Sequence, residues 1–218
     1  PFPEGGQQKL SDALLRIADR EGVTVRCDAH VTRILTRGGR VSGVSLDGGD
    51  EVPARDVITT ISARPLAAML PDDALPHRLM RRLRIWRYST AAFKLDYALA
   101  APVPWTAPEA RTSAVVHVAG ELKSLAAAAQ ASERGDVPDR PALVVGQHTL
   151  FDRSRAPAGK HTLYCYAHVP ARYDCSDDEV AGRIEAQLER FAPGFAGTAL
   201  PRSIRHPQHA TARNPRLV

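Results

Sequence analysis

Residues 5–62 decide the fold, and they read GGQQKLSDALLRIADREGVTVRCDAHVTRILTRGGRVSGVSLDGGDEVPARDVITTIS. In the first part of this stretch, Leu10, Leu14 and Ile17 recur at the spacing of one helix face, with polar residues between them. Gly22 follows at the position where a residue in the left-handed conformation often ends a helix. The sequence therefore predicts a helix that begins after the glycine pair and stops before Gly22.

Short strands are predicted after this helix. Apolar and polar side chains alternate from residue 23 to residue 27, which is the period of a half-buried strand. Two Gly-Gly pairs, at 38–39 and 48–49, stand one strand length apart, and each favours a tight turn. Such closely spaced turns predict an antiparallel meander rather than a strand–helix–strand unit. The predicted strands are residues 23–27, 31–35, 41–46, 51–54 and 57–61.

The composition is that of an ordinary globular protein, with 44% hydrophobic and 24% charged residues among 218. The net charge of +5 comes mainly from arginine, and no basic stripe carries the interleaved aromatic residues of single-strand binders, so we expect no nucleic-acid partner. No apolar run is long enough to span a bilayer. We therefore expect a cytoplasmic protein.

The cysteines favour a reducing compartment. Cys27, Cys165 and Cys175 are odd in number and widely spaced, unlike the cysteines of a disulfide framework. Cys165 and His168 have the spacing of metal ligands, but they lie in a strand pattern with no second pair nearby. We expect a core thiol at Cys165 and no metal site.

The rest of the chain predicts a second group of strands with helices between them. An alanine-rich helix ends at Gly135, and a later helix begins at Ser176, which has the spacing of a capping box with Glu179. The predicted strands of this part lie near residues 89–98, 114–118, 142–149 and 161–169.

The segment from Leu75 to Arg87 predicts a helix in which arginine fills the gaps between leucine and tryptophan. One interpretation is a helix that packs on a core and has a solvated basic face. The other is a helix that lies on an anionic membrane surface, which would make the protein peripheral to the membrane. The sequence leaves both interpretations open. The apolar residues concerned are Leu75, Leu79, Leu83 and Trp86.

Five short motifs, taken in their order and spacing, carry a resemblance to a known family. They are P-x-GG-x-x-x-L-x-x-AL at residues 3–14, V-T-R-I-L at 31–35, G-R-V-x-G-V-x-L-x-x-G at 39–49, A-R-D-V-I at 54–58 and D-R-S-R-A-P-A-G at 152–159. The first four resemble the second FAD-contacting block of the phytoene desaturase family, within the amine-oxidase-like flavoproteins. The fifth resembles a strand lead-in of phytoene-dehydrogenase-like oxidoreductases.

The resemblance implies a mixed α/β chain. Residues 1–64 would form a partial FAD-binding domain with the β-meander, and residues 206–218 the start of the return to it. Residues 65–205 would form a substrate-binding domain with an antiparallel-rich sheet and flanking helices. No G-x-G-x-x-G of a dinucleotide fold and no P-loop occur among the 218 residues. In the family that fingerprint lies upstream of Pro1 and a Gly-Gly-Asp-type block lies downstream of Val218, so we expect an internal fragment.

The resemblance also implies FAD as the cofactor, with four contacts. The backbone of Val31 would hold the adenine edge. Gly5 and Gly6 would let the backbone approach the flavin and would supply free N–H groups. Ser62, at the end of the returning strand, would be a polar contact. Ordinary structural roles for Val31 and the two glycines stay open, and no catalytic residue follows from the sequence.

The function that the resemblance implies is flavin-dependent desaturation or isomerisation of an apolar small molecule, with carotenoids and other isoprenoids as the leading class. Two alternatives stay open. One is a non-catalytic lipid- or protein-binding module that keeps the substrate-domain fold. The other is a flavin-dependent amine or porphyrinogen oxidase.

Overall fold

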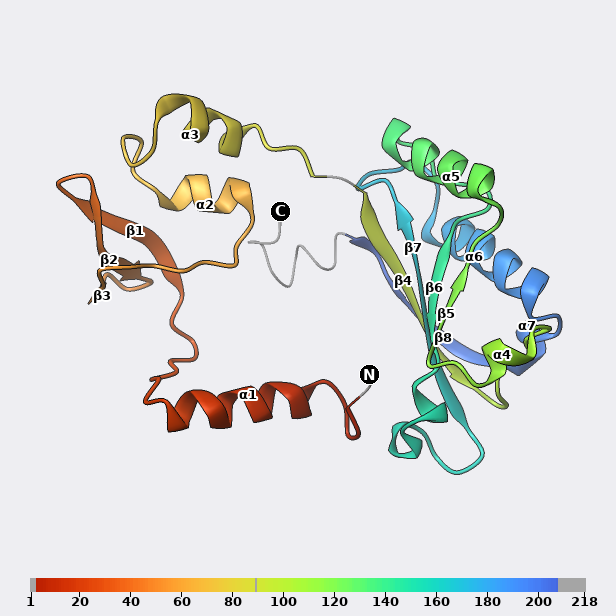
Figure 1. The fold of residues 1–218 in the computed structure, drawn as a ribbon. Coiled ribbons are helices and arrows are strands. Elements are labelled where there is room, and N and C mark those ends of the chain that lie inside the picture. The colour runs from red at the N-terminus through yellow and green to blue at the C-terminus, as the bar shows by residue number, and fades with distance from the viewer. Residues whose placement is uncertain (1–2, 89, 208–218) are drawn as a thin grey trace. The chain divides into compact units, whose positions relative to one another are not determined.

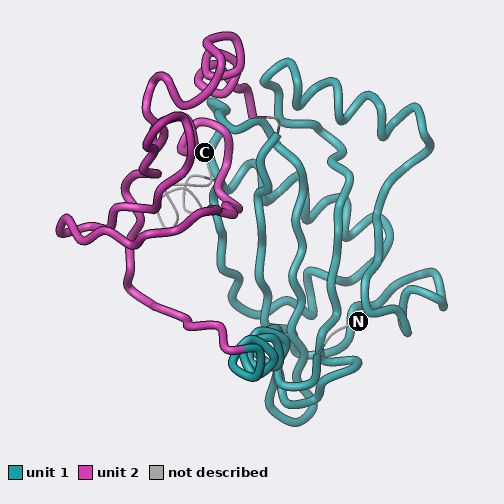
Figure 2. The backbone as a smooth tube through the Cα atoms, turned by 60° about the vertical axis from the view of Figure 1, so that its left-hand side comes forward, with its two compact units in different colours: residues 1–21, 89–209 teal, residues 22–88, 210–218 magenta. Residues whose placement is uncertain are grey.

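The computed structural model describes residues 3–88 and 90–207 (Figure 1). Its described residues form two compact units (Figure 2): unit 1 holds residues 3–21 and 90–207, and unit 2 holds residues 22–88. Most of the predicted return to the FAD-binding domain, residues 208–218, lies outside the described residues.

Unit 1 begins with the predicted helix. Helix α1 runs Gln8–Arg20, and Gly22, just beyond it, has a φ of +75°. The helix prediction is confirmed, with the left-handed glycine beyond its end. No residue of α1 is buried, and Leu10 and Leu14 are 53% and 57% exposed. The apolar face that the sequence predicts is therefore uncovered among the described residues.

A five-stranded antiparallel sheet forms the centre of unit 1, with the strand order β5-β6-β7-β4-β8. All four strands predicted for this part are present, but the one predicted over 142–149 ends at Gly146, before a 3-10 helix at His148–Leu150. The fifth strand, β8, was not predicted, because its sequence, ALPRSIR, does not alternate between apolar and polar residues and contains Pro201. Proline is tolerated there because β8 lies at the edge of the sheet. The strands are β4 Ala91–Leu99, β5 Val115–Val118, β6 Leu143–Gly146, β7 His161–Val169 and β8 Ala199–Arg205.

Helices cover one face of this sheet (Figure 1). The two long ones are α5, Leu122–Arg134, and α6, Asp177–Phe191, and the short ones are α4, Pro108–Arg111, and α7, Phe195–Thr198. The predicted capping box begins α6, and Gly135 ends α5 with a φ of +97°. The core between sheet and helices includes Phe93, Leu95, Leu99, Trp105, Val145, Leu163, Cys165, Val169, Ile184 and Leu188, each at most 2% exposed. Cys165 is therefore the predicted core thiol, and burial raises its pKa.

Unit 2 contains the predicted meander. Strands β1 (Val31–Arg37), β2 (Arg40–Leu46) and β3 (Glu51–Pro53) pair antiparallel in chain order. Gly43 is required for the second pairing, since a Cβ built on it would lie 2.3 Å from the backbone oxygen of Val52. Helix α2 (Ala63–Met69) packs on β1 and on α3 (His77–Arg84).

Two predicted strands of unit 2 are wrong. Residues 23–27 and 57–61 adopt no strand, and neither segment pairs with a strand among the described residues. Val23, Val25 and Ile58 are 54%, 55% and 96% exposed. Alternation and β-branched residues stabilise a strand only where a neighbouring strand supplies hydrogen bonds and a packing surface.

The basic helix is shorter than predicted. Helix α3 begins after Pro76, and Met80 is the residue that it buries, with 2% exposure. Leu79 and Trp86 are 43% and 49% exposed, whereas Leu75 and Leu83 are half-buried, so only part of the apolar stripe faces a core as the first interpretation expects. Because α3 has only about two turns, it presents fewer side chains to the core than a continuous helix over residues 75–86 would.

The compact units differ from the predicted domains in their limits. Helices α2 and α3 lie in unit 2 with the meander, and α1 lies in unit 1. The assignment of a cofactor role and a substrate role to the parts of the chain stays a prediction.

Candidate functional site

The sheet face that α5 and α6 do not cover carries polar and aromatic side chains. Burial alternates along β4 and β7, because successive side chains of a strand point to opposite faces. Lys94 and Asp96 of β4 therefore lie on the same face as Tyr164, Tyr166 and His168 of β7. We call this the helix-free face.

An aromatic row lies along β7 on the helix-free face. Tyr164, Tyr166 and His168 come from β7, and His148, from the 3-10 helix His148–Leu150, extends the row at one end. Ring centroids of successive members lie 4.9, 6.4 and 5.9 Å apart, and the two tyrosine rings are nearly parallel. The Tyr164 ring lies across Gly146 of β6, where a Cβ would come within 2.0 Å of Cε1 of Tyr164. The absence of a side chain at Gly146 thus lets this ring lie close to the sheet.

An ionic cluster lies beside the row. Nζ of Lys94 is 2.6 Å from Oδ1 of Asp96 and 5.4 Å from the ring centroid of Tyr164. Nε of Arg205, on the edge strand β8, is 3.0 Å from Oδ2 of Asp96. The Asp96 carboxylate is therefore shared between two cations from neighbouring strands.

The two residues at one end of the aromatic row, His148 and Tyr164, are uncharged at neutral pH. Burial, followed by the positive charges of Arg155 and Lys94, lowers the pKa of His148. Burial also raises the pKa of Tyr164, which keeps its phenol protonated. A neutral imidazole tilted against a neutral phenol suits an apolar or π-conjugated ligand better than an ionic one.

A cavity of about 600 Å³ opens at this end of the row, and its lining includes Gly5, Lys94, His148, Arg155 and Tyr164. Two of the sequence motifs meet here. The backbone N–H of Gly5 donates to Oδ2 of Asp152 at 2.9 Å, although the two residues are 147 positions apart in the chain.

The two predicted glycines, Gly5 in the lining of this cavity and Gly6 next to it in the chain, have N–H groups that are already hydrogen-bonded. Gly5 and Gly6 have φ values of +78° and +97°, which favour glycine. Their N–H groups are not free as predicted, because Gly5 donates to Asp152 and Gly6 donates to the backbone oxygen of Pro3 at 3.0 Å. Gly5 therefore offers a ligand no free N–H group, but the absence of a side chain lets a ligand approach its backbone closely.

Val31 lies at the start of β1, an edge strand of the unit 2 sheet. The backbone oxygen of the preceding residue, His30, accepts from the N–H of Asp47 at 2.7 Å, on the β2 side. Backbone groups alternate in direction along an antiparallel strand, so the N–H and C=O of Val31 point away from β2, to the side on which no strand of the described residues pairs with β1. This is the geometry that the predicted adenine contact requires.

Ser62 was predicted to end a strand, and this is wrong, because Ser62 is the N-cap residue of α2. The Tyr88 hydroxyl donates to Oγ of Ser62 at 3.0 Å and accepts from the backbone N–H of Arg64 at 3.3 Å. Val31 and Ser62 belong to unit 2, while Gly5 and Gly6 belong to unit 1. Their use by one cofactor stays a prediction.

The comparison with known families matches residues 2–216 to the flavin containing amine oxidoreductases. The chain belongs to this family. It is 31% identical over 181 residues to the zeta-carotene-forming phytoene desaturase of Myxococcus xanthus, which covers 83% of this chain and 33% of the relative. It is 42% identical over 95 residues to the hydroxyneurosporene desaturase of Cereibacter sphaeroides, which covers 41% of this chain and 19% of the relative. The resemblance to the phytoene desaturase group is thus confirmed.

A solved structure shares the fold. An oxidoreductase from Methanosarcina mazei superposes with a TM-score of 0.62 at 20% identity, over 94% of this chain and 43% of that structure. The chain spans less than half the length of each of these three relatives.

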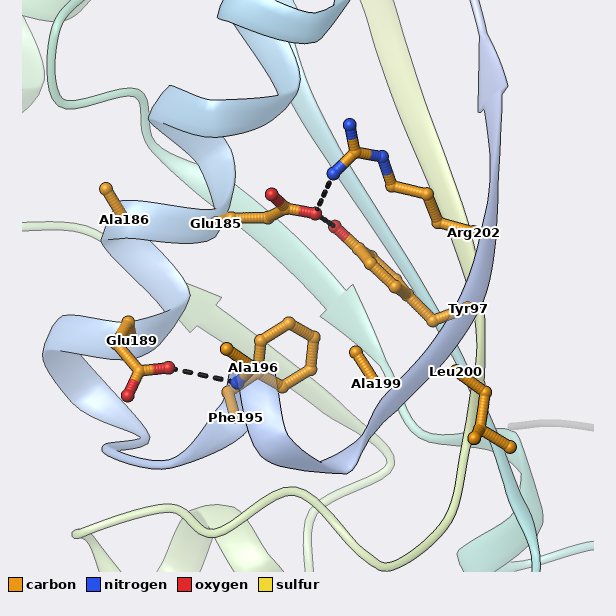
Figure 3. Close-up of a pocket in the computed structure, with 9 residues that line it drawn as sticks. All are labelled: Tyr97, Glu185, Ala186, Glu189, Phe195, Ala196, Ala199, Leu200 and Arg202. Carbon is orange, nitrogen blue, oxygen red and sulfur yellow. Dashed lines mark hydrogen bonds and ion pairs between the residues drawn. The ribbon is translucent and has the colours of Figure 1, made fainter.

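A second cavity, of about 470 Å³, lies between α6, α7 and β8 (Figure 3). Its polar groups already bind one another. The Tyr97 hydroxyl and a guanidinium nitrogen of Arg202 both donate to Oε1 of Glu185, at 3.1 and 2.5 Å. Glu189 accepts from the backbone N–H groups of Gly194 and Ala196 at 2.6 and 3.1 Å. We assign this cavity a structural role, because its charges join the edge strand and the turn after α6 to the helix.

No metal centre was found in the part of the chain that the structure describes, since no group of three or more suitable ligands occurs there. The Cys165–His168 spacing has a simple explanation. Residues three apart in a strand point to opposite faces, so Cys165 is buried in the core and His168 lies on the helix-free face.

Several site residues were missed by the sequence analysis. Asp152 and Arg155 lie inside a quoted motif, but their partners at Gly5 and Gly6 are too distant in sequence to be inferred. The aromatic row had a visible signal, because Tyr164, Tyr166 and His168 alternate with small residues in a predicted strand.

Proposed function

We propose that the chain is part of an FAD-dependent oxidoreductase that desaturates or isomerises an apolar isoprenoid of the carotenoid type. The observation that carries the proposal is the similarity to a zeta-carotene-forming phytoene desaturase across 83% of the chain. The second relative, also named as a desaturase, supports the same substrate class.

The helix-free face supports an extended, conjugated substrate. The aromatic row offers nearly parallel tyrosine rings, and its His148 end is neutral at neutral pH. Aromatic faces pack well against flat apolar groups in offset or edge-on arrangements. The substrate would lie along the row, with its reacting part beside the cavity that Gly5 lines.

The chain's own residues offer a flavin dinucleotide three points of contact. The open backbone edge at Val31 would accept and donate hydrogen bonds to adenine, and the Ser62 hydroxyl would add a polar contact. Gly5 has no side chain to keep a planar ring away from the cavity. FAD, when bound, supplies hydride-accepting chemistry, and the protein orients the substrate and excludes water.

Peripheral membrane contact forms a further part of the proposal. Leu79, Ile85 and Trp86, in or just after α3, are 43%, 60% and 49% exposed, and Arg81 and Arg82 are exposed beside them. Apolar side chains flanked by arginine favour the surface of an anionic bilayer, and an isoprenoid substrate would be dissolved in the hydrocarbon interior of that bilayer. Within the described residues, no helix has the length and apolar character to cross a bilayer.

The test uses the longer protein that contains this chain, purified with FAD. Under anaerobic conditions, desaturation of a carotenoid precursor in liposomes should bleach the visible flavin band and yield a product with a longer conjugated system. Isomerisation should instead yield an isomer of the precursor and leave the flavin oxidised at the end of the reaction. A matched reaction with a primary amine, and another with a porphyrinogen, should leave the flavin oxidised. Turnover of only the amine or the porphyrinogen would overturn the proposal in favour of the corresponding oxidase. A protein that binds lipid without FAD would overturn it in favour of a binding module.

A further inference from the structure

Asp152 is a buried carboxylate that the proposed function does not use. Only 4% of its side chain is exposed, and its partners are all donors. Oδ1 accepts from the backbone N–H and the hydroxyl of Ser154 at 3.1 and 2.6 Å, and Oδ2 accepts from Gly5 N–H at 2.9 Å. Oδ2 also lies 3.8 Å from Nε of Arg155. The Ser154 hydroxyl, followed by the other donors, holds the pKa of Asp152 below its usual range, so it is ionised at neutral pH.

Both members of the Asp152–Arg155 ion pair reach the turn at Gly5 and Gly6. The Arg155 guanidinium lies over Gly6, where a Cβ would come within 2.5 Å of Nη1. Both glycines have positive φ, so the shape of the turn is one that side chains would strain. The turn therefore rests on two side chains from a loop far away in the sequence.

The same loop also reaches the aromatic row. The backbone N–H of Asp152 donates to the backbone oxygen of His148 at 2.9 Å. The His148 ring in turn lies 4.9 Å from the Tyr164 ring. A displacement of Asp152 would therefore also displace the glycine turn and His148, at the end of the aromatic row.

We propose that Asp152 is a positioning residue that fixes the Gly5–Gly6 turn in the geometry that the flavin requires. The inference rests on the proposed function, in which this turn approaches the flavin. A carboxylate is needed, because the amide nitrogen of an asparagine is a donor and would face either Gly5 N–H or the donors of Ser154. One of these donors would then lose its acceptor, and the turn would be free to shift.

The test is Asp152→Asn in the longer FAD-loaded protein, with Asp174→Asn as the matched control because Asp174 is exposed. We expect Asp152→Asn to weaken FAD binding about tenfold. It should also shift the visible spectrum of the bound flavin and speed hydrogen exchange in the segment that contains Gly5. Asp174→Asn should change none of the three. Arg155→Gln keeps the carboxylate and its bond to Gly5, and it should weaken FAD binding about threefold.

Wild-type FAD affinity and flavin spectrum in Asp152→Asn would overturn the inference. If Asp152→Asn does not fold, unchanged FAD affinity in Arg155→Gln overturns it instead. Failure of the proposed function gives a different result, because it appears in the unmodified protein. If the unmodified protein does not bind FAD, both proposals are wrong. If it binds FAD but does not oxidise a polyene, the proposed substrate is wrong, and the Asp152 and Arg155 variants still test the role of Asp152.

Discussion

At the scale of single residues, Gly146 controls the surface on which the proposed substrate would lie. A Cβ at this position would come within 2.0 Å of the Tyr164 ring, which is far inside van der Waals contact. We expect Gly146→Ala to displace the ring, to lower the free energy of unfolding by about 1–3 kcal/mol and to reduce turnover. Denaturant unfolding and steady-state kinetics of the longer protein measure the two effects.

Gly182→Ala is the matched control for that variant. Gly182 lies within α6, and a Cβ built on it meets no atom within 4 Å. Alanine in a helix interior is expected to raise the stability by about 0.5–1 kcal/mol. The double variant Gly146→Ala/Tyr164→Ala should recover stability relative to Gly146→Ala, because it removes the clash. Equal loss in both would contradict the steric explanation.

Single residues also show where sequence reasoning reaches its limit. The burial of Cys165 could be predicted, because it depends on local alternation in β7. The loss of free N–H groups at Gly5 could not, because its acceptor is 147 positions away and only the fold brings the two together. Local patterns report which face a side chain takes, whereas hydrogen-bond partners depend on topology.

At the scale of elements, strands were predicted correctly where turn residues and alternation agreed. The meander of β1, β2 and β3 has glycine pairs at its turns, and β4 and β7 alternate over nine residues each. The two strand predictions that were wrong rested on alternation at 23–27 and on apolar residues at 57–61. Neither segment has a partner strand among the described residues. Strand β8 had the opposite problem, since it pairs with β4 but is mostly exposed.

Helix α3 and the residues after it are the element for which the membrane proposal makes a measurable prediction. We expect the longer protein to co-sediment with anionic liposomes and to bind neutral ones weakly. Arg81→Glu/Arg82→Glu should weaken the anionic binding at least about tenfold, since each basic residue near the surface contributes about 1 kcal/mol. Arg16→Glu/Arg20→Glu, which makes the same charge change on exposed positions of α1, should have a smaller effect. Equal binding by all three proteins would remove α3 as a membrane contact.

At the scale of the whole molecule, the family and the fold class could be predicted from the chain because five motifs retain their order. The antiparallel sheet with helices on one face follows from the same sequence features that predict its strands. The limits of the compact units could not be predicted, because they depend on which surfaces α1, α2 and α3 pack against. Helix packing is set by tertiary contacts, which periodicity alone does not identify.

Residues 1–218 expressed alone should not retain FAD. Dinucleotide affinity depends strongly on a pyrophosphate that meets a helix N-terminus after a glycine-rich turn, and these 218 residues contain no such fingerprint. The open edge at Val31 offers a few hydrogen bonds, each contributing about 1 kcal/mol net. These cannot offset an association cost of at least about 4 kcal/mol. The measurement is the visible absorbance of the purified polypeptide, followed by titration with FAD. A yellow protein, or a Kd in the micromolar range, would contradict this prediction, because it would mean that these 218 residues bind FAD without that fingerprint.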